Sequence, residues 1–181
     1  MKISGGELKK RTLKTPGGNK TRPSSGITRE SIFNIISDRV QGAFVLDLYS
    51  GCGSLGIEAL SRGASFCIFA EKEKKPLDCI NHNIKNFELS KKTKVLKKKL
   101  PEQINSIFLN KTPDIIFMDP PYSSGFINPT LEALKENSMI NKKTLIIVEH
   151  SKEEFPDLKD FEIKDTRKYG KTLVSFLSCM I

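Results

Sequence analysis

Short apolar runs alternate with segments in which apolar residues recur every three or four positions. The apolar runs are each about a strand long and cover residues 44–48, 66–70, 94–96, 114–118 and 144–148. The segments between them have helical spacing and cover residues 55–60, closed by Gly63, then 77–87, 104–108 and 131–134. Apolar strands that are separated by amphipathic helices predict parallel βαβ units, with helices on both faces of one sheet.

A helix is expected before the first of these strands. Thr28 is a good N-cap, because its hydroxyl can accept a hydrogen bond from the first helical turn. Ile27 and Ile32 have the spacing of a hydrophobic staple. The apolar face of this helix contains Ile32, Phe33, Ile35, Ile36 and Val40.

The alternation ends near the C-terminus. Runs at 161–166 and 171–177 are joined by the turn-like Tyr169-Gly170 and have no helix between them, which predicts an antiparallel hairpin. We therefore expect an α/β, Rossmann-like sheet of seven strands that is mostly parallel and finishes in an antiparallel hairpin.

Length and composition fit one soluble domain. The chain has 181 residues, of which 38% are hydrophobic and 28% are charged, and this apolar fraction is sufficient for a core. No run approaches the roughly 18 apolar residues of a membrane span, and the N-terminal residues lack the apolar region of a signal peptide. We expect a cytoplasmic protein without a membrane partner.

Metal and disulfide chemistry are not expected. Cysteines at 52, 67, 79 and 179 form no C-x-x-C pair and are interpreted as free thiols in a reducing compartment. The two histidines are His82, in the middle of a predicted helix, and His150, which follows a strand and could reach a cleft. No residue pairs His150 with a nucleophile.

Positive charge is concentrated at the N-terminus. Residues 1–29 contain eight Lys and Arg and only Glu7 as an acidic residue, so they carry about seven of the nine net positive charges. This segment is also rich in glycine and proline and poor in apolar residues. We interpret residues 1–27 as an extended basic arm before a domain at 28–181, either a solvated tail or a contact for a polyanion.

A glycine-rich loop follows the first strand. Residues 51–56 form G-x-G-x-x-G before a helix, and Glu71 comes twenty positions after Gly51 at the end of the next strand. Glycines allow close approach of the backbone to a ligand, and a carboxylate can accept hydrogen bonds from both ribose hydroxyls. This pattern indicates an adenosine-bearing cofactor, with a ligand-free turn as the alternative.

Asp47 narrows the choice of cofactor. Its carboxylate lies four residues before Gly51, where it would repel a pyrophosphate. S-adenosylmethionine carries a sulfonium and an ammonium group and no phosphate, so this position favours it over a dinucleotide.

The fourth strand leads into Asp119-Pro120-Pro121-Tyr122. Two consecutive prolines donate no backbone hydrogen bond and keep the chain extended, which leaves the Asp119 carboxylate and the Pro120 carbonyl as acceptors. These acceptors can hold the two hydrogens of an exocyclic amino group while Tyr122 stacks on the base. The alternative is a proline turn after a core strand.

These residues resemble the class I S-adenosylmethionine-dependent methyltransferases, and within them the bacterial enzymes that methylate the exocyclic N2 of a guanine in 16S ribosomal RNA. The resemblance covers nearly the whole chain. It is carried by residues 3–6 (ISGG), 21–24 (TRPS), 28–34 (TRESIFN), 46–63 (LDLYSGCGSLGIEALSRG) and 119–122 (DPPY). It implies the class I methyltransferase sheet, with S-adenosylmethionine as cofactor and no metal.

The resemblance also implies a role for particular residues. The expected catalytic residues are Asp119, Pro120, Pro121 and Tyr122. The expected cofactor-binding residues are Arg22, Asp47, Ser50, Gly51, Gly53, Leu55, Glu71, Lys72 and Leu100. The expected RNA-binding residues are Lys9, Lys10, Arg11, Lys20 and Arg22. Lys99 departs from the family, which usually has Asp or Asn there, so reading of the adenine edge falls to the backbone of Leu100.

The favoured function is methylation of a guanine amino group in 16S ribosomal RNA by a monomer that acts on a small-subunit precursor. A DNA adenine-N6 methyltransferase also uses Asp-Pro-Pro-Tyr, but those enzymes usually carry a target-recognition domain for which 181 residues leave no space. A nicotinamide-dependent oxidoreductase would explain the glycine loop. A non-enzymatic RNA-binding module would need only the basic arm.

Overall fold

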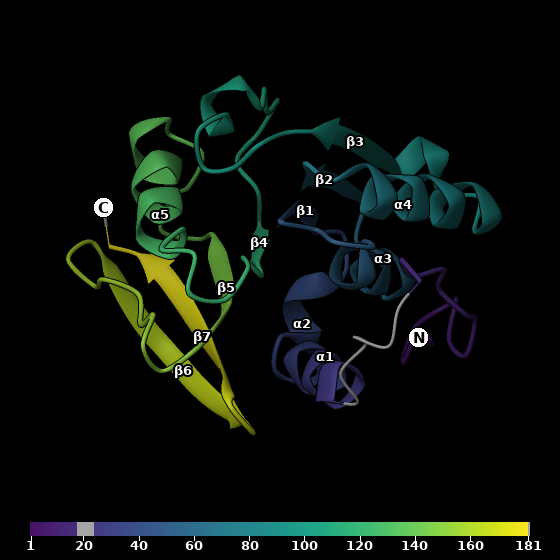
Figure 1. The fold of residues 1–181 in the computed structure, drawn as a ribbon, viewed down its shortest axis with the longest axis horizontal. Helices are drawn as coiled ribbons and strands as arrows, with labels where there is room; N and C mark the ends of the chain where they lie inside the picture. The colour runs from purple at the N-terminus through teal and green to yellow at the C-terminus, as the bar shows by residue number, and fades with distance from the viewer. Residues whose placement is uncertain (18–23, 181) are drawn as a thin grey trace.

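A single sheet forms the centre of the computed structural model, which describes residues 1–17 and 24–180. The strands within these residues are β1 (Phe44–Leu48), β2 (Phe66–Glu71), β3 (Thr93–Lys97), β4 (Ile115–Met118), β5 (Leu145–His150), β6 (Phe161–Tyr169) and β7 (Thr172–Cys179). They are arranged in the order β3-β2-β1-β4-β5-β7-β6, and the sheet runs across the molecule from β3 to β6 (Figure 1).

The sheet has the predicted mixture of strand directions. The five strands β1 to β5 pair in parallel, whereas β7 runs antiparallel between β5 and β6. All five residues of β1 are buried, because this central strand has a neighbour on each side and packed layers above and below. The prediction of seven strands ending in an antiparallel hairpin is confirmed.

Helices cover both faces of the sheet. The helices are α1 (Ser24–Ile35), α2 (Ser37–Val40), α3 (Ser54–Ser61), α4 (Lys74–Asn86) and α5 (Ile127–Glu136), with short 3-10 turns η1 (Ser90–Lys92) and η2 (Ile104–Ser106). One core cluster joins α1 to α4 with one face of the sheet, and a second joins α5 and η2 with the opposite face. The expected three-layer α/β arrangement is therefore present.

The first helix differs from its prediction. It begins at Ser24, so Thr28 lies inside the helix rather than at its N-cap. Ile27 is 70% exposed and does not form a staple with Ile32. Four of the five predicted apolar residues are buried, whereas Ile35 is 41% exposed because it points away from the sheet-facing side.

The predicted helix at 104–108 is also wrong. Only the 3-10 turn η2 forms there, and Phe108 is 79% exposed. Pro101 and Pro113 confine this connection to a short segment, and Asn105 and Ser106 favour turns over helix interior. Ile104 and Ile107 still cover the sheet beside α5.

The N-terminal segment is not an extended arm over residues 1–17. Lys2 and Thr12 form an antiparallel bridge, and Ile3 and Leu13 are each 2% exposed within the main core. Lys14 and Asn83 of α4 exchange two hydrogen bonds, at 2.8 and 3.0 Å. This segment therefore packs onto the domain, because Ile3 and Leu13 are placed where they can reach the core and Met1 and Leu8 pack against it.

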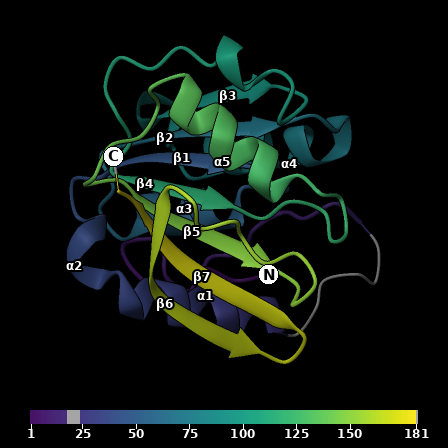
Figure 2. The same cartoon turned by 90° about the vertical axis from the view of Figure 1, so that its left-hand side faces the viewer.

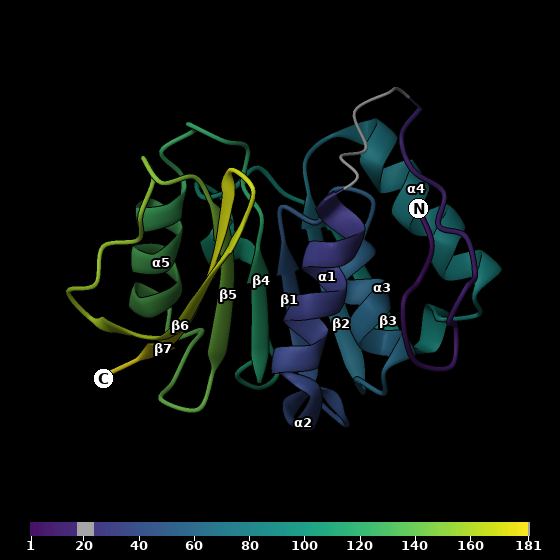
Figure 3. The same cartoon turned by 90° about the horizontal axis from the view of Figure 1, so that it is seen from below.

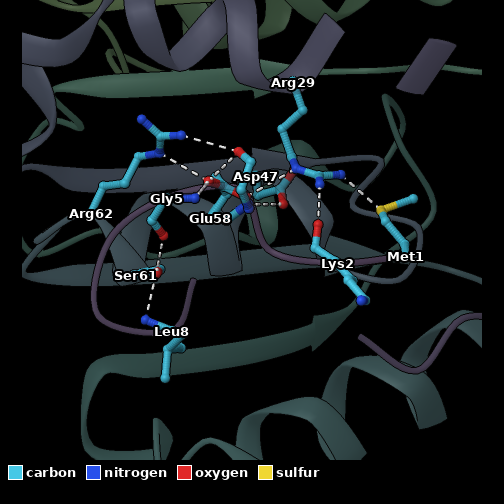
Figure 4. A network of polar contacts seen from close by, with 11 residues as sticks. Met1, Lys2, Gly5, Leu8, Arg29, Asp47, Glu58, Ser61 and Arg62 are labelled. Atoms are coloured by element: carbon cyan, nitrogen blue, oxygen red, sulfur yellow. Dashed lines mark hydrogen bonds and ion pairs between the residues drawn. The ribbon is translucent and has the colours of Figure 1, made fainter. Parts of the chain in front are cut away.

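Glu58 of α3 fastens the N-terminal segment to the domain. Its fully buried carboxylate accepts hydrogen bonds from the backbone N–H groups of Ser4 and Gly5 and from the guanidinium groups of Arg29 and Arg62. Figure 4 shows Glu58 between these two arginines. Arg29 belongs to the basic segment by sequence, but it is 3% exposed and its charge is neutralised here.

No helix in residues 1–17 and 24–180 is both long and apolar enough to cross a membrane.

Candidate active site

One cavity of about 510 Å³ opens where the carboxyl ends of the parallel strands meet. Ligands bind at this edge in open α/β sheets. Its lining residues are Met1, Thr28, Tyr49, Ser50, Gly51, Cys52, Ser54, Ala70, Glu71, Lys72, Glu73, Pro76, Lys98, Leu100, Asp119, Pro120, Pro121, Tyr122, Phe126, Glu149 and Thr172. The glycine loop and the Asp-Pro-Pro-Tyr segment therefore face the same space.

The glycine loop turns sharply between β1 and α3. Gly51 and Gly53 have φ values of 54° and 78°, in the left-handed region that a residue with a Cβ rarely adopts. Ser50 stabilises the turn by donating a hydrogen bond of 2.6 Å to the carbonyl of Asp47. A Cβ on Gly53 would also lie 3.2 Å from Phe69, so the loop requires glycine for both conformation and space.

Glu71 ends β2 and is held by three backbone N–H groups. Its Oε2 atom accepts a hydrogen bond of 2.9 Å from Gly51, and its Oε1 atom accepts bonds from Lys72 and Glu73 at 2.7 and 2.9 Å. These bonds fix the carboxylate at the cavity wall beside the glycine loop. A carboxylate oriented in this way can still accept hydrogen bonds from vicinal hydroxyls of a ligand.

Asp47 lies behind the loop and is 2% exposed. Burial raises its pKa well above the usual value, the hydrogen bond of 3.0 Å from the Gly56 N–H opposes this change, and the negative charges of Asp119 and Glu71 raise the pKa further. The carboxylates of Asp119 and Glu71 at the cavity wall are thus close enough to act on the buried Asp47. A cationic ligand would relieve their mutual repulsion.

The Asp-Pro-Pro-Tyr segment begins directly after β4. Asp119 is exposed at the cavity, whereas Pro120 is buried. The packing of Pro120 therefore fixes the backbone that carries the Asp119 carboxylate. The hydroxyl of Tyr122 is hydrogen-bonded to the Thr172 hydroxyl of β7 at 2.6 Å, which holds the ring at the rim. The carboxylate, the proline carbonyl and the aromatic ring therefore come from one short, stiff stretch of chain.

Two long-range contacts support this segment and were missed by sequence reasoning. Glu154 accepts hydrogen bonds from the backbone N–H groups of Ser123 and Gly125, just after the tetrapeptide. Tyr49 stacks on Phe126 with ring centroids 6.1 Å apart, and burial raises the pKa of Tyr49 to about 12. No local sequence signal pairs these positions.

Most of the expected site residues line the cavity. They are Ser50, Gly51, Glu71, Lys72, Leu100, Asp119, Pro120, Pro121 and Tyr122. Asp47, Gly53 and Leu55 do not line it and lie behind the loop. Lys20 and Arg22 fall outside the described residues.

The expected RNA-binding residues Lys9, Lys10 and Arg11 lie far from the cavity. Their turn contacts Ser61, the last residue of α3, and Arg11 donates a hydrogen bond of 2.9 Å to the carbonyl of Asn86, the last residue of α4. Both helices run away from the carboxyl edge of the sheet. This turn is therefore at the amino edge, about 20 Å away by the length of α4.

Among the histidines and cysteines, Cys52 lines the cavity and the others do not. His82 is exposed on α4. His150 is 1% exposed, is hydrogen-bonded to Ser175 and does not line the cavity, so its expected reach into a cleft is wrong. The four cysteines are free, and the described residues contain no cluster suited to a metal ion.

The strand order, the reversed β7 and the cavity between a glycine loop and Asp-Pro-Pro-Tyr define a class I methyltransferase. Residues 1–178 match the family described as "Conserved hypothetical protein 95", and the chain belongs to this family.

Three similar proteins agree with this class. The chain is 35% identical over 178 residues to YlbH of Bacillus subtilis, which is named as a candidate rRNA methyltransferase, with 97% of each chain covered. It is 32% identical over 155 residues to ribosomal RNA small subunit methyltransferase D of Escherichia coli K12, covering 82% of this chain and 74% of that protein. YhhF of Escherichia coli, named as a candidate methyltransferase, has the same fold, with a TM-score of 0.87, 24% identity and 99% and 97% coverage.

Proposed function

We propose that this protein acts in the cytoplasm as a monomer and transfers a methyl group from S-adenosylmethionine to the exocyclic N2 amino group of a guanine in 16S ribosomal RNA. The substrate is a partly assembled small ribosomal subunit. One observation carries the proposal: Glu71 beside the glycine loop and Asp119 of the Asp-Pro-Pro-Tyr segment line one cavity. A cofactor bound beside Glu71 would therefore lie next to an amine held at Asp119.

The side chains of the cavity suit S-adenosylmethionine. Glu71 would hold the ribose hydroxyls, Gly51 leaves the backbone open for the methionine part, and Leu100 would read the adenine edge through its backbone. Glu71 and Asp119 would provide a negative environment for the sulfonium and ammonium groups, and a bound cation would favour ionisation of Asp47 behind the loop. When bound, the cofactor supplies an activated methyl group.

The Asp-Pro-Pro-Tyr segment would receive the base. The Asp119 carboxylate and the Pro120 carbonyl accept the two amino hydrogens, while the ring of Tyr122 stacks on the base. An exocyclic amine is a poor nucleophile, so its orientation contributes much of the rate. Glu154 and Thr172 act as positioning residues because they hold the chain that carries these groups.

The choice of ribosomal RNA rests on similar proteins. Two of them carry ribosomal RNA in their names, and the described part of this chain shows no separate target-recognition domain of the kind that DNA adenine methyltransferases usually carry. A nicotinamide dinucleotide is disfavoured because its pyrophosphate would face the carboxylates around the glycine loop.

Calorimetry and rRNA mass spectrometry test the two halves of the proposal. We expect heat of binding with S-adenosylmethionine and none with a nicotinamide dinucleotide. Ribosomal RNA from cells that lack the gene should have lost one methylated guanosine, and the purified protein should restore it on small subunits from those cells. Tight dinucleotide binding, or an unchanged set of methylated nucleosides, would refute the proposal.

The role of Asp119 is tested by Asp119→Ala. We expect methyl transfer to fall at least about 100-fold, because a misplaced amine loses that much rate, while binding of S-adenosylmethionine continues. Glu132→Ala is the matched control, because this carboxylate is exposed on α5 away from the cavity. Equal turnover of the two variants would remove Asp119 from the acceptor site.

A further inference from the structure

The turn between β6 and β7 projects past the sheet at the edge that carries the cavity. β7 pairs with β5 so that Leu173 lies opposite His150, the last residue of β5. Residues 168–172, called here the hairpin tip, therefore extend beyond the carboxyl end of β5. Figures 2 and 3 show this turn at the same end of the molecule as the start of α1.

The hairpin tip is held in place from two sides. Thr172 lines the cavity and is hydrogen-bonded to the hydroxyl of Tyr122 at 2.6 Å. Tyr169 is hydrogen-bonded through its hydroxyl to Ser31 of α1. These contacts attach the tip to the segment that would stack on the target base and to α1, whose Thr28 also lines the cavity. The tip is thus a fixed part of the rim.

Two lysines of the hairpin tip are free to meet a ligand. Lys168 and Lys171 are exposed and form no ion pair with any residue in the described parts of the chain. Further along the same strand, Arg167 is instead paired with Asp165 at 2.8 Å, and Lys164 with Glu162 at 2.6 Å. Within the β6–β7 hairpin, the positive charges without an ion pair are therefore at the tip.

The charge of the cavity explains why such a rim would be needed. Four carboxylates, those of Glu71, Glu73, Asp119 and Glu149, line the cavity together with the ammonium groups of Lys72 and Lys98. Acidic groups therefore outnumber basic ones there, which disfavours entry of a phosphodiester backbone. A base can enter only if its flanking phosphates are stabilised outside. Lysines on the hairpin tip, close in the chain to Thr172, can provide this stabilisation without lining the cavity itself.

We propose that Lys168 and Lys171 bind the phosphate groups that flank the target guanine, so that the hairpin tip holds the RNA strand while the base lies in the cavity. This inference rests on the proposed function, since it takes RNA as the substrate. The nucleotide must leave its stack to reach Asp119, and phosphate contacts at the rim hold its backbone in that arrangement. The tip is then the RNA-binding element nearest the reaction, in contrast to Lys9, Lys10 and Arg11.

The double variant Lys168→Gln/Lys171→Gln tests the proposal. On small subunits from cells that lack the gene, we expect kcat/KM at 150 mM salt to fall about tenfold or more, with affinity for S-adenosylmethionine unchanged. Each lost phosphate contact on a single strand reduces the magnitude of the slope of log K against log salt by about 0.7. For RNA binding by the double variant, we therefore expect a slope that is smaller in magnitude by about 1.4. Lys168→Arg/Lys171→Arg should keep the slope.

The control is Lys142→Gln/Lys143→Gln, which removes the same charge from the exposed turn before β5, at the opposite edge of the sheet. A slope loss no greater than in this control overturns the proposal. So does a loss on intact particles without any loss on protein-free 16S ribosomal RNA, because the tip would then contact a ribosomal protein.

The binding slope separates this inference from the function on which it rests. It is measured by equilibrium binding of 16S ribosomal RNA and needs no turnover. If the unmodified protein fails to methylate small subunits, the proposed function fails, while the slope still decides whether the hairpin tip binds phosphate. If methylation occurs and the slopes are equal, only the hairpin tip is excluded.

Discussion

Asp47 shows how one residue can favour ligand binding at the expense of the empty fold. The residue is 2% exposed, and its carboxylate accepts a hydrogen bond from the Gly56 N–H. Burial raises its pKa, and Asp119 and Glu71 add negative charge nearby. Glu71 is only half-buried and has three N–H donors, so its charge is better compensated. A cationic cofactor would supply the positive charge that the Asp47 carboxylate lacks.

Asp47→Asn should therefore stabilise the cofactor-free protein and weaken cofactor binding. Between pH 3.8, the usual pKa of aspartate in the unfolded chain, and the raised pKa of the folded state, the folded wild type keeps a proton on Asp47 that the unfolded chain has lost. This group thus contributes stability at low pH that is lost as pH rises through the raised folded-state pKa. Urea unfolding between pH 4 and 8 should show that the free energy of unfolding of the variant increases relative to that of the wild type as pH rises.

Affinity for S-adenosylmethionine should fall about tenfold or more in the same variant, as expected for loss of one charged interaction. Asparagine retains an oxygen for the Gly56 N–H, so the loop itself should be preserved. A pH-independent difference in stability together with unchanged affinity would contradict the electrostatic role of Asp47.

At the scale of elements, strands were predicted well and helix boundaries less well. The run at 44–48 coincides with β1 because a buried strand requires local apolar residues only. The start of α1 depended on neighbours in space. The predicted helix at 104–108 did not form because turn-favouring residues compete with it. α3 depends on a close approach to β2, where Gly56 faces Phe69 and Cys67.

Gly56→Ala should separate α3 from β2. A Cβ at this position would lie 2.3 Å from the Phe69 ring and 2.6 Å from the Cys67 sulfur, in a region without space to relax. We expect a loss of about 1–3 kcal/mol in the free energy of unfolding by urea denaturation. Gly26→Ala in α1 is the matched control, because nothing lies within 4 Å of its added Cβ, and it should stabilise the protein by about 0.4–1 kcal/mol. Similar effects at both positions would contradict this packing.

At the scale of the whole molecule, the most specific sequence motifs serve assembly of the fold as well as chemistry. Residues 3–6, 28–34 and 58–63 carry much of the family resemblance, and they meet at the buried Glu58 carboxylate. Burial by itself raises the pKa of Glu58, but hydrogen bonds from Ser4 and Arg62 and the charge of Arg29 lower it overall. The N-terminal segment, α1 and α3 are thereby joined to one another.

Glu58→Ala should cost about 3–5 kcal/mol in the free energy of unfolding, because Arg29 would remain buried without its partner. In the wild type, the stability contributed by the Glu58 charge is present above its usual pKa of 4.5 and is lost as pH falls through the lowered folded-state value. Glu58→Gln should lack this acid-dependent loss. Denaturant titrations at pH 7 and below 4.5 measure both effects, and an unchanged midpoint for the alanine variant would exclude this role.

The position of Lys9 and Lys10 predicts that their contribution to RNA binding depends on the size of the substrate. They lie at the amino edge, about 20 Å from the cavity along α4. Lys9→Gln/Lys10→Gln should lower the salt slope by about 1.4 on intact small subunits and leave it unchanged on a short RNA fragment around the target guanine. Filter binding at several salt concentrations measures this. An equal effect on both substrates would mean that the two lysines reach the cavity side.

The sequence by itself determined where the groups of the candidate site lie along the chain. They follow in the order of a buried first strand, a glycine loop, an acidic residue at the end of β2 and Asp-Pro-Pro-Tyr after β4. These features are local, because strand burial, tight turns and proline stiffness act within a few residues. Only the tertiary structure decided that Ile3 and Leu13 join the core and that Glu58 is buried against two arginines. It also decided that the β6–β7 turn with Lys168 and Lys171 lies at the carboxyl edge of the sheet, whereas the turn with Lys9 lies at the amino edge. Those outcomes depend on strand register and on packing between distant segments, which no local pattern encodes.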